Sequence, residues 1–347
     1  MKPGLKLVAL AVIGMASAVP RAVIAQERQD QQELNVVCSA QPDWCTLMAT
    51  AFEQESGARV IMVRKSTGET LAQIRAQASD PKIDVWWGGT GDPHLIAAAE
   101  GLTQPINIDI SDLLGWAQNM SAISGGRTFG VYAGALGIAY NWKLLAAKGL
   151  AAPKCWKDLA NPAYDGQIEV ADPNSSGTAY TELATFVQLF GEDEAFRLLV
   201  EIGKNVSKYT SSGSAPSKAV ALGQTTISIG FMHDMAKLIS LGFPLKIVAP
   251  CEGTGYEVGA VSVITGAKNP GLAKQWVEFA LRPDIQSRAI EVKSYQVPSN
   301  VKSLVAPESP DLAAIKLIDY DFATYGSPDT RARLLARWDG EVKNAGN

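Results

Sequence analysis

The sequence predicts an α/β protein of about two domains, and three observations support this prediction. Apolar, β-branched runs alternate with helix-like segments over most of the chain, which is typical of sheets covered by helices on both faces. The length of 347 residues is that of roughly two domains. Several predicted strands end in Ser, Thr and Gly just before a helix start. We therefore expect parallel sheets with a ligand site at the carboxyl ends of the strands.

The expected strands and helices follow from the spacing of apolar residues. The strands are placed at Leu34–Ala40, Arg59–Arg64, Ile83–Trp87, Gly130–Tyr140, Gln167–Ala171, Thr225–Met232, Leu245–Ala249 and Val258–Ile264. Helical spacing is clearest at Leu183, Phe186, Val187 and Phe190, and again at Leu272, Trp276, Phe279 and Ala280.

Residues 1–25 have the pattern of a secretory signal peptide. Two lysines precede an apolar run at residues 7–19 and a small-residue patch that ends at Ala25, which is the order that a cleavable signal requires. A proline and an arginine interrupt the apolar run well short of the roughly 20 residues of a membrane-spanning helix. We expect cleavage after Ala25, with Ala18 as the second choice, and a soluble periplasmic protein.

The four cysteines lie beyond this leader, in a compartment that permits disulfides. Four cysteines allow three pairings. We favour Cys38 with Cys45 and Cys155 with Cys251, because the short first spacing suits a local link across a strand-to-helix turn. No C-x-x-C pair occurs, so metal binding by these residues is not expected.

Composition and motifs argue against nucleic-acid binding and catalysis. The net charge is −4 and no run of Lys or Arg occurs, so nucleic acid is not an expected partner. The chain has no G-x-S-x-G motif, and its two histidines, His94 and His233, cannot form an H-E-x-x-H zinc site. His233 and Asp234 are adjacent, so on an extended segment they would point apart. We expect neither an enzyme nor a cofactor or metal.

Polar and glycine residues at the strand ends are the candidate ligand-binding residues. A helix start offers unpaired N–H groups and the positive end of a dipole, which suit an anion or a hydroxyl-rich ligand. Ser and Thr at these positions are also ordinary N-caps, so capping alone is the alternative at each of them. The candidates are Ser39, Ser66, Thr67, Gly89, Thr90, Ser176, Gly177 and Thr178.

Six segments in order along the chain give a resemblance to a known family. They are Val36–Ser39, Asp84–Gly89, Gly137–Asn141, Trp156–Pro162, Ala171–Thr178 and Tyr295–Asn300. On these segments the chain resembles the type 2 periplasmic solute-binding proteins of ABC transporters, in the group of the ferric-iron-binding proteins.

The resemblance implies a two-lobed α/β fold with a ligand cleft between the lobes. Lobe I would comprise residues 26–135 and 256–347, and lobe II residues 136–255. Crossing hinge strands are expected near Tyr132–Ala139 and Ile247–Gly255. Ligand binding in this family closes the lobes by hinge rotation, and the closed form is recognised by an inner-membrane ABC permease. We expect a monomer with a small-molecule ligand.

The resemblance also suggests the ligand class. Ferric-iron binders of this group carry two adjacent tyrosines after the strand at Thr225, whereas this chain has Phe231-Met232-His233-Asp234 there. That stretch is similar to the hexose-phosphate-binding members, in which a His-Asp pair and a downstream glutamate hold the sugar. The corresponding residues are His233, Asp234 and Glu257. Another phosphorylated solute or phosphonate, a polyamine and ferric iron remain the alternative ligands.

Overall fold

The computed structural model describes Met1 and residues 32–343, and residues from Glu33 onward form one structural unit. The predicted signal peptide, beyond Met1, lies outside the described residues. Within the described part of the chain, no helix is both long and apolar enough to cross a membrane.

The strands form a mixed sheet in the order β2-β1-β3-β9-β4-β7-β5-β6, with β8 and β10 also paired to β4. Neighbours are parallel within β2-β1-β3 and within β7-β5-β6. However, β9 and β4 run antiparallel to their neighbours, so the expectation of parallel sheets was only partly right. The strands are β1 (Glu33–Cys38), β2 (Arg59–Arg64), β3 (Val85–Thr90), β4 (Phe129–Asn141), β5 (Ile168–Ala171), β6 (Val206–Thr210), β7 (Ile227–Phe231), β8 (Leu245–Val248), β9 (Tyr256–Val263) and β10 (Val297–Pro298).

Helices follow most strands, and the two predicted amphipathic segments are helical. Leu183, Phe186 and Val187 are buried on α7, and Trp276 and Phe279 are buried on α11. The α-helices are α2 (Pro42–Ser56), α3 (Thr67–Ala76), α4 (Gly91–Ala99), α5 (Gly115–Ile123), α6 (Trp142–Ala147), α7 (Gly177–Phe190), α8 (Glu192–Lys204), α9 (Ala215–Ala221), α10 (Met232–Ser240), α11 (Pro270–Ala280), α12 (Pro283–Ser287), α13 (Phe322–Tyr325) and α14 (Pro328–Glu341). The 3-10 helices are η1 (Trp156–Ala160), η2 (Pro162–Tyr164) and η3 (Arg288–Val292).

Two large hydrophobic clusters define the two lobes. The first lobe packs β1 and β3 against α2 and α11, around Phe52, Trp87 and Trp276. The second lobe packs β5 and β7 against α7 and α8, around Phe186 and Phe196. The C-terminal helix α14 belongs to the second cluster through Leu334 and Trp338 and lies beside α8, although residues 256–347 were expected in lobe I.

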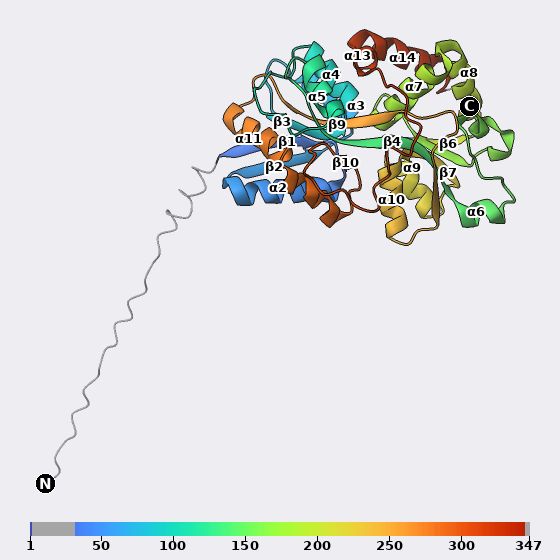
Figure 1. Cartoon of the computed structure of the whole chain (residues 1–347), viewed down its shortest axis with the longest axis horizontal. Helices are drawn as coiled ribbons and strands as arrows, with labels where there is room; N and C mark the ends of the chain where they lie inside the picture. Colours follow the sequence, from blue (N-terminus) through green and yellow to red (C-terminus); the bar gives the residue numbers. More distant parts are fainter. Residues whose placement is uncertain (2–31, 344–347) are drawn as a thin grey trace. The chain divides into compact units, whose positions relative to one another are not determined.

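The two lobes are joined through β4 and β9, which run between the two groups of helices (Figure 1). β4 pairs with β9 and β10 through residues 129–135 and with β7 and β8 through residues 136–141. The return connection, expected as a strand within Ile247–Gly255, instead leaves β8 at Val248 and has little regular structure before β9 begins. β4 enters the second lobe and β9 returns to the first, so the two strands pair antiparallel. The lobe boundaries at residues 135 and 255 remain predictions.

Both favoured disulfides are present. Cys38 at the end of β1 is bonded to Cys45 in α2, with their Cα atoms 6.0 Å apart. Cys155, just before η1, is bonded to Cys251, which follows β8, with a Cα separation of 4.8 Å. The first bond is the local strand-to-helix link that the spacing predicted, and the second closes a long loop within the chain.

Candidate functional site

A polar cavity lies where the two lobes meet, and its walls include every candidate ligand-binding residue from the sequence. The candidates that line it are Ser39, Ser66, Thr67, Gly89, Thr90, Ser176, Gly177, Thr178, His233, Asp234 and Glu257.

Three helix N-termini meet on one side of the cavity. Ser66, Thr90 and Ser176 are the N-cap residues of α3, α4 and α7, and all three are buried in the cavity wall. Ser176 caps α7 through a hydrogen bond from the Ala179 amide to its hydroxyl, 3.4 Å. The Ser66 amide donates to Glu69, 3.1 Å, as the predicted capping box requires. Capping and a place in the cavity therefore coexist, and the starts of three helices line one space.

Glycines allow the backbone to come close at this end of the cavity. Gly89 has a φ of +80° and a Cβ there would lie 2.2 Å from Thr67 Cγ2, so a larger residue would be both strained and blocked. A Cβ on Gly177 would lie 2.0 Å from Thr90 Oγ1 and 2.1 Å from Thr67 Oγ1. Gly177 of the second lobe thus fits directly between two threonines of the first lobe.

The cavity also contains residues that sequence reasoning missed. Arg64, the last residue of β2, brings a guanidinium group and hydrogen bonds to the Ala40 carbonyl, 3.3 Å. Its position as the last residue of a predicted strand was the available signal. For most of the other missed residues no local motif pointed to a ligand. They are Ala40, Gln41, Tyr132, Gly213, Ser214, Phe231 and Gln296.

Another part of the cavity wall is acidic and contains His233, Asp234 and Glu257. His233 Nε2 lies 3.6 Å from Glu257 Oε1 and 3.8 Å from Asp234 Oδ1. His233 and Asp234 occupy the first turn of α10, so the expected extended segment was wrong. Successive side chains on a helix are about 100° apart around the axis, and the two groups lie too far apart for a hydrogen bond, as expected for adjacent residues.

Burial sets the charge of these groups. Burial raises the pKa of Glu257 well above its ordinary value, and the charge of Asp234 acts in the same direction. Burial lowers the pKa of His233, against the opposing charge of Asp234. The neutral forms of Glu257 and His233 are therefore favoured, and a protonated carboxyl can donate as well as accept a hydrogen bond. The buried Nδ1 atom of His233 has no hydrogen-bond partner among the described residues.

The hydroxyl of Tyr132 in the cavity wall favours its neutral form, unlike the ionised tyrosine that binds a hard metal. Burial raises the pKa of its hydroxyl well above the ordinary value, and the hydroxyl accepts a hydrogen bond from the Gly89 amide, 2.7 Å. Among the described residues, the one cluster with metal-binding spacing comprises Cys155, Cys251 and Glu252, and the disulfide occupies both sulfur atoms.

Hydrogen bonds join the two lobes beside the cavity. The Gly68 amide donates to the Ser175 carbonyl, 3.0 Å, and the Ser66 hydroxyl donates to the Ser211 carbonyl, 3.0 Å. At the acidic end, Gln41 Nε2 donates to Asp234 Oδ1, 2.7 Å.

Comparisons with known proteins agree with this geometry. Residues 81–324 match the model of a family described as bacterial extracellular solute-binding proteins. The chain is 41% identical, over 97% of its length and 94% of the other, to an uncharacterized protein of Haemophilus influenzae.

Two solved structures are similar over nearly their whole length. One is the periplasmic binding protein AfuA from Actinobacillus pleuropneumoniae with exogenous fructose-6-phosphate bound, at 41% identity and a TM-score of 0.89, covering 91% of this chain and 100% of that one. The other is the periplasmic binding protein P5PA, at 32% identity and a TM-score of 0.88, covering 90% and 100%.

Proposed function

Because this chain belongs to the bacterial extracellular solute-binding proteins, we propose that it binds a hexose phosphate in the cleft between its lobes and delivers it to an ABC permease. The observation that carries the proposal is that one cavity is lined both by donors at three helix starts and by the acidic residues Asp234 and Glu257. A phosphorylated sugar matches both, with an anion at one end and neighbouring hydroxyls at the other.

The phosphate group would occupy the end formed by the helix N-termini. Backbone N–H groups and helix dipoles at such positions favour anions, and Arg64 adds a guanidinium group that can pair with phosphate oxygens. The hydroxyls of Ser66, Thr67 and Thr178 supply further donors on the same wall.

The sugar would occupy the acidic end. Asp234 can accept hydrogen bonds from two neighbouring hydroxyls, and neutral Glu257 and His233 can each donate or accept. Negative charge at this end would repel a phosphate, which fixes the direction of the ligand. The relative with fructose-6-phosphate bound, at 41% identity, supports this ligand class.

The hydrogen bonds between the lobes around the cavity suit a protein that binds and releases a ligand rather than a catalyst. Ligand contacts from both lobes would favour the closed form, which a permease in the inner membrane would recognise. We place this cycle in the periplasm, with the mature protein acting as a monomer that needs no cofactor.

Thermal-shift and calorimetric titrations test the proposal. The panel would contain glucose 6-phosphate, fructose 6-phosphate, the free hexoses, inorganic phosphate, aminoethylphosphonate, spermidine and Fe(III). Hexose phosphates should raise the melting temperature, because a ligand that binds only the folded state stabilises it. A shift with spermidine or Fe(III) alone would contradict the assignment.

Asp234→Ala tests the sugar end of the cavity. The substitution removes the carboxylate at the sugar end and should weaken hexose-phosphate binding by more than about tenfold, which corresponds to about 1.4 kcal/mol. Asp234 is partly exposed, so the melting temperature without ligand should change little. Unchanged affinity by calorimetry would remove Asp234 from the ligand contacts.

A further inference from the structure

We propose that the C-terminal helix α14 positions the turn at residues 172–178, and that Arg331 is the residue through which it does so. This turn carries Ser176, Gly177 and Thr178 in the cavity wall. The inference rests on the proposed function and deepens it, because it assigns control of the phosphate end to a helix that does not line the cavity.

Side chains of α14 and the residues just after it hold the turn at three points. Arg331 Nη2 donates to the Pro173 carbonyl, 3.1 Å. Asn174 Nδ2 donates to Asp339 Oδ1, 3.0 Å, and Lys343 Nζ donates to Asp172 Oδ2, 3.1 Å. These contacts join residues that lie 158, 165 and 171 positions apart along the chain. Of the three, only the bond from Arg331 is fully buried.

Arg331 is an unusual residue for its position because only 5% of it is exposed. A buried guanidinium is costly unless its surroundings compensate for the lost water. Its guanidinium carbon lies 4.3 Å from the centre of the Tyr180 ring, in the first turns of α7, and this cation–π contact offsets part of that cost. Arg331 therefore contacts both the turn and the start of the helix that follows it.

The charge of Arg331 also acts on the first lobe through Asp92. Asp92 lies in the first turn of α4, two residues after Thr90 of the cavity wall, and is fully buried. It accepts hydrogen bonds from the Tyr320 hydroxyl, 3.2 Å, and from Thr181 of α7, 3.5 Å. Burial raises the pKa of Asp92 to about 6, against the hydrogen bond from Tyr320 and the charge of Arg331.

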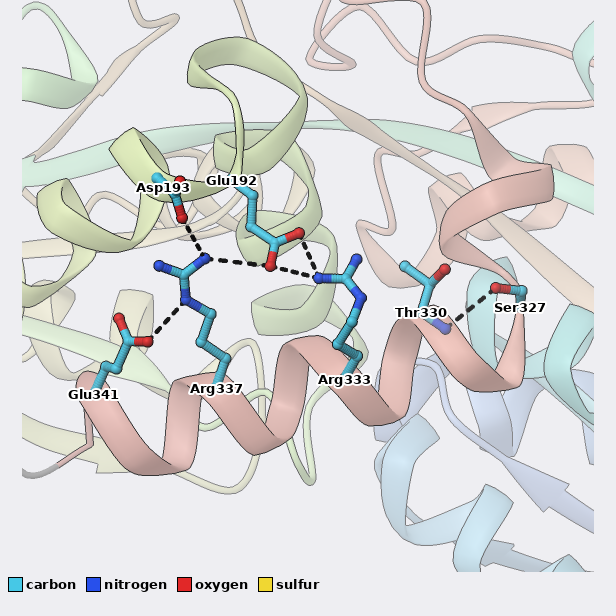
Figure 2. A network of polar contacts seen from close by, with 7 residues as sticks. All are labelled: Glu192, Asp193, Ser327, Thr330, Arg333, Arg337 and Glu341. Atoms are coloured by element: carbon cyan, nitrogen blue, oxygen red, sulfur yellow. Dashed lines mark hydrogen bonds and ion pairs between the residues drawn. The ribbon is translucent and has the colours of Figure 1, made fainter.

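Partly exposed ion pairs, each of which contributes little to stability, also link α14 to α8 (Figure 2). Glu192 pairs with Arg333 and, at 3.2 Å, with Arg337. Arg337 also pairs with Asp193, 2.9 Å. Arg333 points to α8, whereas Arg331, two residues earlier, contacts the turn, and this makes Arg333 a matched control on the same helix.

The experiment compares Arg331→Met with Arg333→Gln in the full mature protein. Amide hydrogen exchange of residues 172–176 reports the turn directly, since several amides there are hydrogen-bonded within it. Titration with glucose 6-phosphate reports binding. We expect Arg331→Met to speed exchange in this segment at least threefold and to weaken binding at least fivefold, while exchange in α8 and both readouts for Arg333→Gln stay at the wild-type level.

Wild-type exchange in residues 172–176 of Arg331→Met, faster exchange with unchanged affinity, or the same changes in Arg333→Gln would each overturn the proposal. If Arg331→Met does not fold, Arg331→Lys replaces it in the test because lysine keeps the buried charge. Exchange of residues 172–176 should then be faster and binding weaker than in the wild type, by smaller factors than for Arg331→Met. If the wild-type protein binds no hexose phosphate, the proposed function fails, and the exchange result alone decides the role of Arg331.

Discussion

Replacing Gly177 by alanine should block full closure of the lobes and weaken ligand binding. The new Cβ would lie 2.0 Å from Thr90 Oγ1 and 2.1 Å from Thr67 Oγ1. Both threonines are buried, so neither can turn freely out of the way, and the lobes must separate by about 1 Å at this point. Overpacking of this kind costs about 1–3 kcal/mol. At 1.4 kcal/mol per decade, affinity should fall by about 5- to 150-fold.

The fold itself should tolerate Gly177→Ala. Gly177 is the first residue of α7 and does not have a positive φ, so alanine is acceptable there, and the melting temperature without ligand should not fall. Gly115→Ala is the matched control, because Gly115 is the first residue of α5 and its Cβ would meet nothing within 4 Å. Calorimetry with fructose 6-phosphate measures the effect. Wild-type affinity in Gly177→Ala would refute the closure geometry.

Two further predictions concern stability. Burial raises the pKa of Glu182 to about 8, so the unfolded chain releases this proton first and the folded protein loses stability as pH rises from about 4.5 to 8, at about 1.4 kcal/mol per unit. Glu182→Gln should remove that part of the loss in urea unfolding at pH 5 and pH 8, and an unchanged pH dependence would contradict it. Removing the Cys155–Cys251 bond, with a sequence separation of 96, should cost about 4–5 kcal/mol, against about 2 kcal/mol for Cys38–Cys45, with a separation of 7. Equal urea midpoints for the two double-serine variants would contradict the loop-length argument.

The strand ends were predictable because their signals are local. Ser66, Thr90 and Ser176 each follow an apolar run and precede a helix, and this pattern alone placed them at one edge of the sheet. The structure brings them to one cavity. His233, Asp234 and Glu257 required the family resemblance, since an adjacent His-Asp pair is otherwise an ordinary polar pair.

Features that depend on contacts between distant segments were not predictable. The strand β6 was missed because Val206–Thr210 is an edge strand with two exposed residues and no apolar run. The antiparallel β4 and β9 have the same residue pattern as buried parallel strands. Arg331 could not be linked to Pro173 from the sequence, because no spacing rule relates residues 158 positions apart.

A crystal structure of the mature protein with fructose 6-phosphate tests the central claim most directly. The account predicts the phosphate among the starts of α3, α4 and α7, beside Ser176 and Thr178, with sugar hydroxyls on Asp234 and Glu257. A ligand bound in the reverse direction, or an empty cleft at saturating concentration, would contradict it.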